Sequence, residues 1–218
     1  MGTKPRFKYD FSNKEIKQGI EHEFYTLASQ YLKLTVSEGI STVTGPDWRR
    51  HVKNLFDVFG KRKLNIYEIN DDIYVNIYQE SREEDLIKVE HSSIETAKTS
   101  FIDCDLTCIS DVEVIERTLT SQIINKAGYP NPKAFIATVG LRGNDSSDYD
   151  SIFRRLFGLL GARCQRVMST TVIPLNLGLP YFKHNLKFQL IKSRIEFYKC
   201  YVYNAGGGPM ITLLIIYK

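Results

Sequence analysis

Alternating apolar and polar positions dominate the C-terminal part of the chain. The runs 186–190 and 194–203 alternate, whereas 210–217 is apolar at nearly every position. Period-two alternation predicts strands with one wet face, and a short run that is apolar on both sides predicts a strand covered on both faces. The glycine-rich segment 205–209 lies between the last two runs and predicts a turn. We therefore expect a C-terminal hairpin that supplies the central strand of a sheet.

Apolar residues at helical spacing predict about four helices. The first covers 13–33, behind a capping-box sequence at Ser12–Glu15. The second begins near Pro46, where proline and an acidic residue favour a helix start, and it ends at Gly60. Two further helices are expected, from the capping box at 110–113 to Gly128 and over 152–160.

The remaining apolar runs predict strands. A hairpin is expected over 64–78, with Asn70–Asp72 as its turn and a row of tyrosines on one face. Further strands are expected at 86–90, 99–109, 134–139 and 163–173. These elements predict one α+β domain over residues 1–218, with a mixed, mostly antiparallel sheet and helices packed against it. The prolines near 129–132 mark a candidate boundary within it.

Composition indicates a folded intracellular protein. The 218 residues are 43% hydrophobic, which is enough to fill a sizeable core. No run reaches the roughly 18 apolar residues of a membrane span, and the N-terminus lacks the apolar segment of a signal peptide. The spacing of the four cysteines suits a reducing compartment. We therefore expect no membrane partner and no secretion by a signal peptide.

Charge is unevenly distributed along the chain. Residues 44–63 carry six basic and two acidic side chains, whereas 68–116 carry three basic and fourteen acidic ones. Complementary patches of this kind favour association between copies of one chain. The alternative is that the two segments lie side by side in the fold and neutralise each other.

Basic and aromatic side chains together suggest a contact surface. Cations can neutralise phosphates, and tyrosine rings can stack on bases or cover a protein interface. The alternative is a solvated helix face beside half-buried tyrosines. The candidate contact residues are Arg49, Arg50, Lys53, Lys61, Arg62, Lys63, Tyr67, Tyr74, Tyr78, Lys187, Lys192 and Arg194.

Three motifs that could bind phosphate or metal have simpler explanations. Gly206–Gly208 lacks the Lys-Ser/Thr of a phosphate-binding loop, so we interpret it as a turn. The acidic loop Asn144–Asp150 lacks the ligand pattern of an EF-hand and is interpreted as a helix cap. Cys104 and Cys108 lack the spacing of a zinc knuckle and are expected to pack as small apolar side chains. We predict no metal and no cofactor.

One alternative is catalytic. His22, Asp47 and Glu68 occur in an order similar to that of the metal ligands in nucleases of the PD-(D/E)xK type, which implies a metal-dependent nuclease or phosphohydrolase. Asn70 stands where that pattern has lysine. No other catalytic residue is predicted.

The pattern as a whole favours a non-catalytic structural or assembly protein of viral type. We expect it to associate with itself through its charged and tyrosine-rich surfaces and to contact nucleic acid through its basic side. The two alternatives are the metal-dependent hydrolase and a monomeric nucleic-acid-binding module.

Overall fold

Strands and helices alternate through the first hundred residues of the chain. The structure, a computed structural model, describes residues 14–35, 38–106, 114, 117–118, 133–140, 173–174, 195–204 and 209–217. In chain order, the elements are α1 (Lys14–Tyr31), β1 (Ile40–Val43), the 3-10 helix η1 (Gly45–Asp47), α2 (Trp48–Phe59), β2 (Leu64–Tyr67), α3 (Asp71–Glu80), β3 (Ile87–Glu90), the 3-10 helix η2 (Ile94–Thr96), β4 (Phe101–Leu106), β5 (Lys133–Gly140), β6 (Ile173–Pro174), β7 (Ile195–Asn204) and β8 (Pro209–Tyr217).

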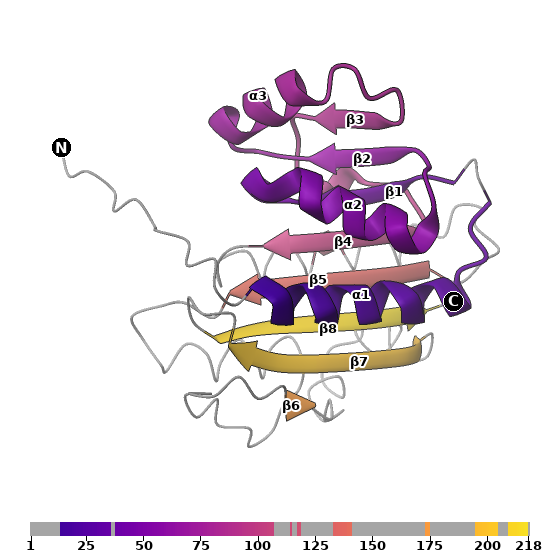
Figure 1. Cartoon of the computed structure of the whole chain (residues 1–218). Helices are drawn as coiled ribbons and strands as arrows, with labels where there is room; N and C mark the ends of the chain where they lie inside the picture. The colour runs from indigo at the N-terminus through magenta and orange to yellow at the C-terminus, as the bar shows by residue number, and fades with distance from the viewer. Residues whose placement is uncertain are drawn as a thin grey trace.

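All the described strands belong to one sheet, in the order β3-β2-β1-β4-β5-β8-β7-β6 (Figure 1). The five strands from β3 to β5 are parallel to one another. Strand β8 lies between β5 and β7 and runs antiparallel to both. The chain moves outward from β1 to β2 and β3 and then returns to β4 on the other side of β1. The strand order therefore reverses between β1 and β4.

This topology corrects the predicted fold class. The architecture is α/β with a largely parallel sheet, and the expectation of an α+β fold with a mostly antiparallel sheet is wrong. The main cause is segment 64–78, which forms β2 followed by helix α3 instead of a hairpin. The side chain of Asn70 accepts a hydrogen bond from the backbone N–H of Ile73 at 3.1 Å and caps that helix. Ile73 and Ile77, four residues apart, then face the core.

Several elements lie where the sequence predicts them. Helices α1 and α2 are present, and Gly60 ends α2 with a positive φ of 73°. Strands β3, β4 and β5 fall within or beside the predicted ranges, and the C-terminal hairpin is present as β7 and β8. The predicted helix over 152–160, the boundary near 129–132 and most of the predicted helix after 110–113 lie outside the described residues.

Helices α1 and α2 cover one face of the sheet (Figure 1). Phe24, Tyr25 and Ala28 of α1 are fully buried and, with Leu55 of α2, join a cluster that includes Phe101 of β4. The rings of Phe59 and Phe101 lie 4.9 Å apart, centroid to centroid. Burying an aromatic or leucine side chain contributes about 1.5–3 kcal/mol, so this face anchors α1 and α2 firmly over β1 and β4.

Strand β7 is tied to α1 by aromatic stacking and by a small polar cluster. Tyr201 stacks on Phe24 with ring centroids 5.4 Å apart, and its hydroxyl donates a hydrogen bond to Glu23 at 2.9 Å. Lys199 forms an ion pair with the same carboxylate.

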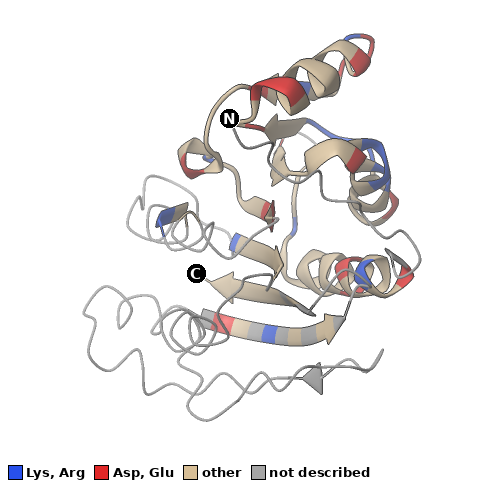
Figure 2. Cartoon of the chain, turned by 90° about the vertical axis from the view of Figure 1, so that its left-hand side faces the viewer, with Lys and Arg blue, Asp and Glu red and all other residues tan. Residues whose placement is uncertain are grey.

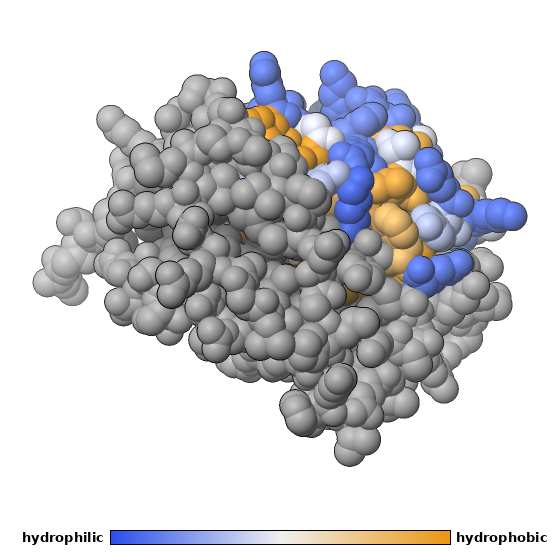
Figure 3. All heavy atoms as spheres, turned by 90° about the horizontal axis from the view of Figure 1, so that it is seen from below, coloured by the Kyte–Doolittle hydropathy of each residue, from blue (hydrophilic) through white to orange (hydrophobic). Residues whose placement is uncertain are grey.

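In the view from below, hydrophilic and apolar side chains are interspersed over the described part of the surface (Figure 3).

Candidate active site

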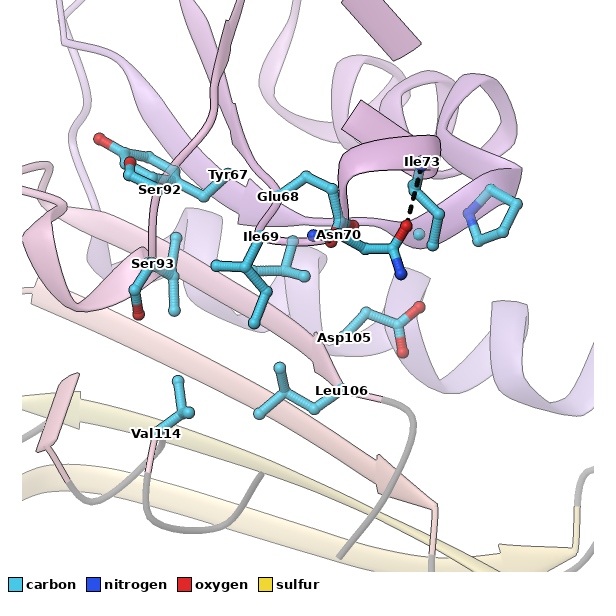
Figure 4. A pocket seen from close by; sticks show the side chains of 14 residues that line it. Tyr67, Glu68, Ile69, Asn70, Ile73, Ser92, Ser93, Asp105, Leu106 and Val114 are labelled. Atoms are coloured by element: carbon cyan, nitrogen blue, oxygen red, sulfur yellow. Dashed lines mark hydrogen bonds between the residues drawn. The ribbon is translucent and has the colours of Figure 1, made fainter. Parts of the chain in front are cut away.

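A cavity of about 270 Å³ opens at the carboxyl ends of the parallel strands (Figure 4). Val43 ends β1, Tyr67 ends β2 and is followed by Glu68, and Asp105 and Leu106 end β4. In open α/β sheets, ligands bind outside the carboxyl ends of the strands, at the point where the strand order reverses. This cavity occupies that position, beside the reversal between β1 and β4.

The lining of the cavity is apolar with a few polar groups. The side chains of Ile69, Leu106 and Val114 project into the same space, and the polar ends of Asn70 and Asp105 lie to one side of them (Figure 4). Ile69 is 71% exposed, which is unusual for an isoleucine. Binding sites for small organic molecules have this composition, in which apolar surface gives affinity and a few polar groups fix the orientation.

Glu68 is the buried carboxylate of this cavity. It is 8% exposed, and its Oε1 accepts a hydrogen bond from the backbone N–H of Asn70 at 2.8 Å. Its own backbone N–H donates to the carbonyl of Glu90 at 3.1 Å, which extends the β2–β3 pairing by one residue. These two bonds hold the carboxylate at the end of β2.

The turn that follows β1 passes directly along the cavity. Gly45, the first residue of η1, has a φ of 64°, in the left-handed region that favours glycine, and Pro46 follows it. Dinucleotide-binding folds carry a glycine-rich turn at this position, which lets the backbone approach a ligand closely. Here one glycine stands in that turn, so the glycine pattern by itself gave no signal.

A buried cluster of charged groups lies behind Asp105, under α1 and α2. Lys17 of α1 donates to both carboxylate oxygens of Asp105, at 2.7 and 2.6 Å, and its Nζ lies 3.5 Å from Oε1 of Glu21. Burial alone would lower the pKa of Lys17, but the charges of Asp105 and Glu21 raise it above its usual value. Burial raises the pKa of Glu21, and Lys17 and His51 oppose that shift.

His51 and Asp103 form the centre of this cluster. His51 Nε2 lies 2.9 Å from Oδ2 of Asp103 and 2.9 Å from the hydroxyl of Thr42, and Tyr25 donates to the same Asp103 oxygen at 2.6 Å. Burial by itself lowers the pKa of His51, but the charge and hydrogen bond of Asp103 raise it above its ordinary value. The pKa of Tyr25 is raised by burial and by Asp103.

Hydroxyl groups continue the polar row across the sheet. Asp105 pairs in register with Thr138 of β5, which pairs with Thr212 of β8. The two threonine hydroxyls lie 3.0 Å apart, and the Tyr203 hydroxyl lies 2.8 Å from that of Thr212. Burial raises the pKa of Tyr203, although Lys17 opposes it, so this phenol stays protonated at neutral pH.

The nuclease alternative finds no support in the geometry. His22 is exposed and lies 3.1 Å from the Asn54 side chain, and Asp47 pairs with Arg50 at 3.2 Å. Glu68 faces the cavity and accepts from the Asn70 backbone. The three side chains belong to different elements and contact different groups. Within the described part of the chain, they do not contact one another.

The predicted contact residues fall in several different settings. Lys53, Lys61 and Lys63 are exposed, whereas the guanidinium of Arg62 donates to the carbonyl of Phe59. Tyr67 is buried and lines the cavity. Tyr74 and Tyr78 lie on α3, not on a strand, and stack on each other with centroids 5.8 Å apart. Lys187, Lys192 and Arg194 lie outside the described residues.

The acidic and basic segments meet in the fold. Arg49 pairs with Glu80 at 3.3 Å and thereby links the basic helix α2 to the acidic helix α3. Lys88 pairs with Glu90 within β3, and Lys and Arg lie beside Asp and Glu over the described part of the chain (Figure 2). The Arg49–Glu80 ion pair is a contact of the kind expected if the two segments neutralise each other within the fold.

The buried cluster was missed from sequence. Lys17, Glu21 and His51 stand on the helical positions that face the sheet, and Asp103 and Asp105 interrupt an otherwise apolar strand. Acidic residues at alternating positions of a buried strand were the available signal, because such residues are seldom buried without a partner.

No helix in the described ranges is long and apolar enough to cross a membrane.

Comparison with known proteins identifies the fold. No family model and no curated protein sequence matches the chain. Among solved structures, the METTL16 methyltransferase domain is similar with a TM-score of 0.52 and 12% identity, over 96% of this chain and 70% of that one. The 23S rRNA methyltransferase ErmE is similar with a TM-score of 0.50 and 10% identity, over 92% of this chain and 68% of that one.

These comparisons correct the predicted function. Both similar structures are methyltransferases, so the interpretation as a non-catalytic structural or viral assembly protein is wrong. The described chain has the fold of methyltransferase domains, with its cavity where the strand order of that fold reverses.

Proposed function

We propose that the chain is a methyltransferase that uses S-adenosylmethionine as methyl donor and a nucleic acid as acceptor. One observation carries the proposal: a cavity with a buried carboxylate, Glu68, lies at the carboxyl end of β2 beside the reversal of strand order. Fold alone does not define function, so the site residues must fit the donor.

The residues of the cavity fit an adenosine group. In nucleotide-binding sheets of this kind, an acidic residue at the end of the second strand, about 20 residues beyond the glycine turn, accepts hydrogen bonds from the ribose hydroxyls. Glu68 has that place, directly after the strand that follows Gly45. Ile69, Ile94 and Leu106 supply apolar surface for an adenine ring, and Ser93 adds a polar group at the edge.

The turn after β1 would hold the amino-acid end of the donor. Val43, Gly45 and Pro46 line the cavity, and the positive φ of Gly45 bends the backbone along it. Asn70 adds an amide on the same side of the cavity as Asp105 (Figure 4). When bound, S-adenosylmethionine supplies an electrophilic methyl group on a positively charged sulfur.

The remaining task of the protein is to position the acceptor. Asp105 lines the cavity, and Lys17 fixes both of its carboxylate oxygens. A carboxylate held in this way can accept a hydrogen bond from an O–H or N–H of the acceptor and so orient its nucleophilic atom. Correct orientation can supply several kcal/mol of the barrier, on the order of 7–11 kcal/mol in well-aligned systems. The apolar side chains of Ile69 and Leu106 would exclude water from the cavity.

The choice of a nucleic acid rests on two observations. ErmE, whose fold this chain shares, is a 23S rRNA methyltransferase. In addition, α2 begins next to Pro46 at the cavity and carries the exposed cation Lys53, and the exposed Lys61 and Lys63 follow its far end, before β2. A nucleic acid that extends from the cavity along α2 would meet these lysines, which neutralise phosphates and raise affinity in a salt-dependent manner.

Calorimetric titration with S-adenosylhomocysteine tests the donor site. We expect saturable binding of one equivalent to the wild-type chain and a loss of about tenfold or more in Glu68→Ala, because a good hydrogen bond to a charged group is worth about 1.5–3 kcal/mol. Glu83→Ala is the matched control, since Glu83 is exposed and outside the cavity lining. Absence of binding, or equal binding by Glu68→Ala, would remove the proposal.

Transfer of a radiolabelled methyl group tests the acceptor. Wild-type protein should label RNA or DNA in the presence of labelled S-adenosylmethionine, and Glu68→Ala should not. If donor binding is intact but only protein or small-molecule acceptors are labelled, the methyltransferase assignment stands and the nucleic-acid acceptor is wrong.

A further inference from the structure

Three potential metal ligands converge under α1 and α2. Glu21 of α1, His51 of α2 and Asp105 of β4 each offer one ligand atom, and these atoms lie within 4.8 Å of one another. Ligands that share a first-row divalent ion stand about 2.0–2.2 Å from it, so small side-chain movements would bring the three atoms onto one ion. We propose that Glu21, His51 and Asp105 form a binding site for a divalent metal cation.

Glu21 supplies the observation that points to a ligand. It is 3% exposed, and within the described part of the chain its one recorded partner is Lys17 Nζ at 3.5 Å. That separation is beyond the usual length of a charged hydrogen bond, about 2.7–2.9 Å. A buried carboxylate at this distance from its cation is only partly compensated for the hydration that it has lost. A metal ion bound between Glu21 and Asp105 would complete that compensation.

His51 is oriented as metal-binding histidines are. Every hydrogen bond that the described residues make with its ring is through Nε2, which donates to Asp103 and lies 2.9 and 3.4 Å from the hydroxyls of Thr42 and Tyr25. Metal-ligating histidines commonly donate their other ring N–H to a carboxylate, which fixes the ring and raises its basicity. Asp103 has this role here, held in turn by the Tyr25 hydroxyl at 2.6 Å. Nδ1 is then the ring atom left for the metal.

The charge of the cluster favours a divalent ion. The three carboxylates of Glu21, Asp103 and Asp105 carry −3 and Lys17 carries +1, which leaves −2 when His51 is neutral. Lys17 is the cation present in the structure, and it occupies both oxygens of Asp105. Metal binding therefore requires the ammonium of Lys17 to leave Asp105, and its long side chain permits this. Lys17 acts as a competitor that weakens the site.

The donor set selects the class of metal. Two carboxylates and one imidazole, without thiolate, suit Mn²⁺ or Zn²⁺ better than a soft ion. Three protein ligands leave coordination positions for water. Since Asp105 also lines the cavity, the ion would lie at the cavity's inner edge. The metal site itself does not depend on the identity of the methyl donor.

Titration with Mn²⁺, followed by electron paramagnetic resonance, tests the site in the full chain. We expect one tightly bound Mn²⁺ and, in pulsed spectra, coupling to one imidazole nitrogen. Glu21→Gln and His51→Gln should weaken binding by about tenfold or more, and Lys17→Met should strengthen it by removing the competing cation. Glu23→Gln, on the same helix but paired with Lys199 and Tyr201, is the control and should bind normally.

Two results would overturn the inference. One is no Mn²⁺ binding by either the wild-type chain or Lys17→Met. The other is binding without nitrogen coupling, or with equal affinity in Glu21→Gln. The wild-type and Lys17→Met measurements decide the question even if the buried variants do not fold. Calorimetric titration with S-adenosylhomocysteine after EDTA treatment reports the methyl-donor site separately, so failure of one site is distinguishable from failure of the other.

Discussion

The Glu68 carboxylate of the cavity is joined to helix α3 through Asn70. The Glu68 carboxylate accepts from the Asn70 backbone at 2.8 Å, and the Asn70 side chain in turn accepts from the backbone of Ile73 at 3.1 Å. The residue that caps α3 thus also fixes the carboxylate that we assign to the ribose. Stability of the helix and affinity for the donor are linked at this point.

Asn70→Ala should affect both properties. Loss of an N-cap typically costs about 1 kcal/mol of unfolding free energy. We also expect weaker S-adenosylhomocysteine binding, because the loop that holds Glu68 loses its anchor. Urea denaturation and calorimetry measure the two effects. Asn76→Ala, in the exposed middle of α3, is the control and should leave both unchanged or raise stability slightly. Equal behaviour of the two variants would contradict the linkage.

Phe101→Ala should be among the most destabilising single changes. The ring is fully buried and contacts the rings of Tyr25 and Phe59, with centroids 6.1 and 4.9 Å away. Removing a buried phenylalanine costs about 3–5 kcal/mol, through lost burial and the cavity left behind. Chemical denaturation measures the loss. A cost below about 1 kcal/mol would mean that α1 and α2 are not packed on β4 as described.

Tyr201→Phe should have a small effect confined to the contact between α1 and β7. The change removes the hydrogen bond to Glu23 and keeps the ring that stacks on Phe24. A single hydrogen bond contributes about 0.5–1.5 kcal/mol, so the unfolding free energy should fall by that amount. Tyr201→Ala, which also removes the ring, should cost clearly more. If the two variants are equal, the stacking is not a stabilising contact.

The exposed lysines near α2 should contribute to nucleic-acid affinity through phosphate contacts. In Lys61→Gln with Lys63→Gln, we expect weaker RNA binding and a salt slope reduced by about one for each lost contact. Filter binding across a series of salt concentrations measures the slope. Lys88→Gln is a suitable control, because Lys88 lies on the edge strand β3 in the acidic segment and pairs with Glu90. An unchanged slope would place the acceptor elsewhere on the molecule.

The sequence predicted local elements better than their arrangement. Helix α2 was predictable because Pro46 and Gly60 mark its ends and its apolar stripe is regular. The prediction for segment 64–78 was wrong because the segment carries two signals. Ile73, Val75 and Ile77 alternate with polar or aromatic residues as in a strand, but Asn70 followed by two aspartates is also typical of a helix start. The predicted hairpin took the place of a strand–helix–strand unit. The sheet was therefore predicted to be mostly antiparallel, whereas it is largely parallel.

The site was largely out of reach of the sequence. Glu68 was named, but as a metal ligand, since nothing local shows that β2 ends beside a reversal of strand order. The buried cluster joins residues up to 88 positions apart, Lys17 and Asp105 among them. Such contacts depend on the order of strands in the sheet, and periodicity alone does not give that order.

Photochemical crosslinking of S-adenosylmethionine labelled on its methyl group tests the central claim most directly. The account predicts that, on irradiation, the label attaches to peptides that line the cavity, those containing Val43–Pro46, Tyr67–Asn70, Ser92–Ile94 or Asp105–Leu106, and that unlabelled S-adenosylhomocysteine prevents it. Labelling confined to peptides away from the cavity, or labelling that the competitor does not reduce, would contradict it.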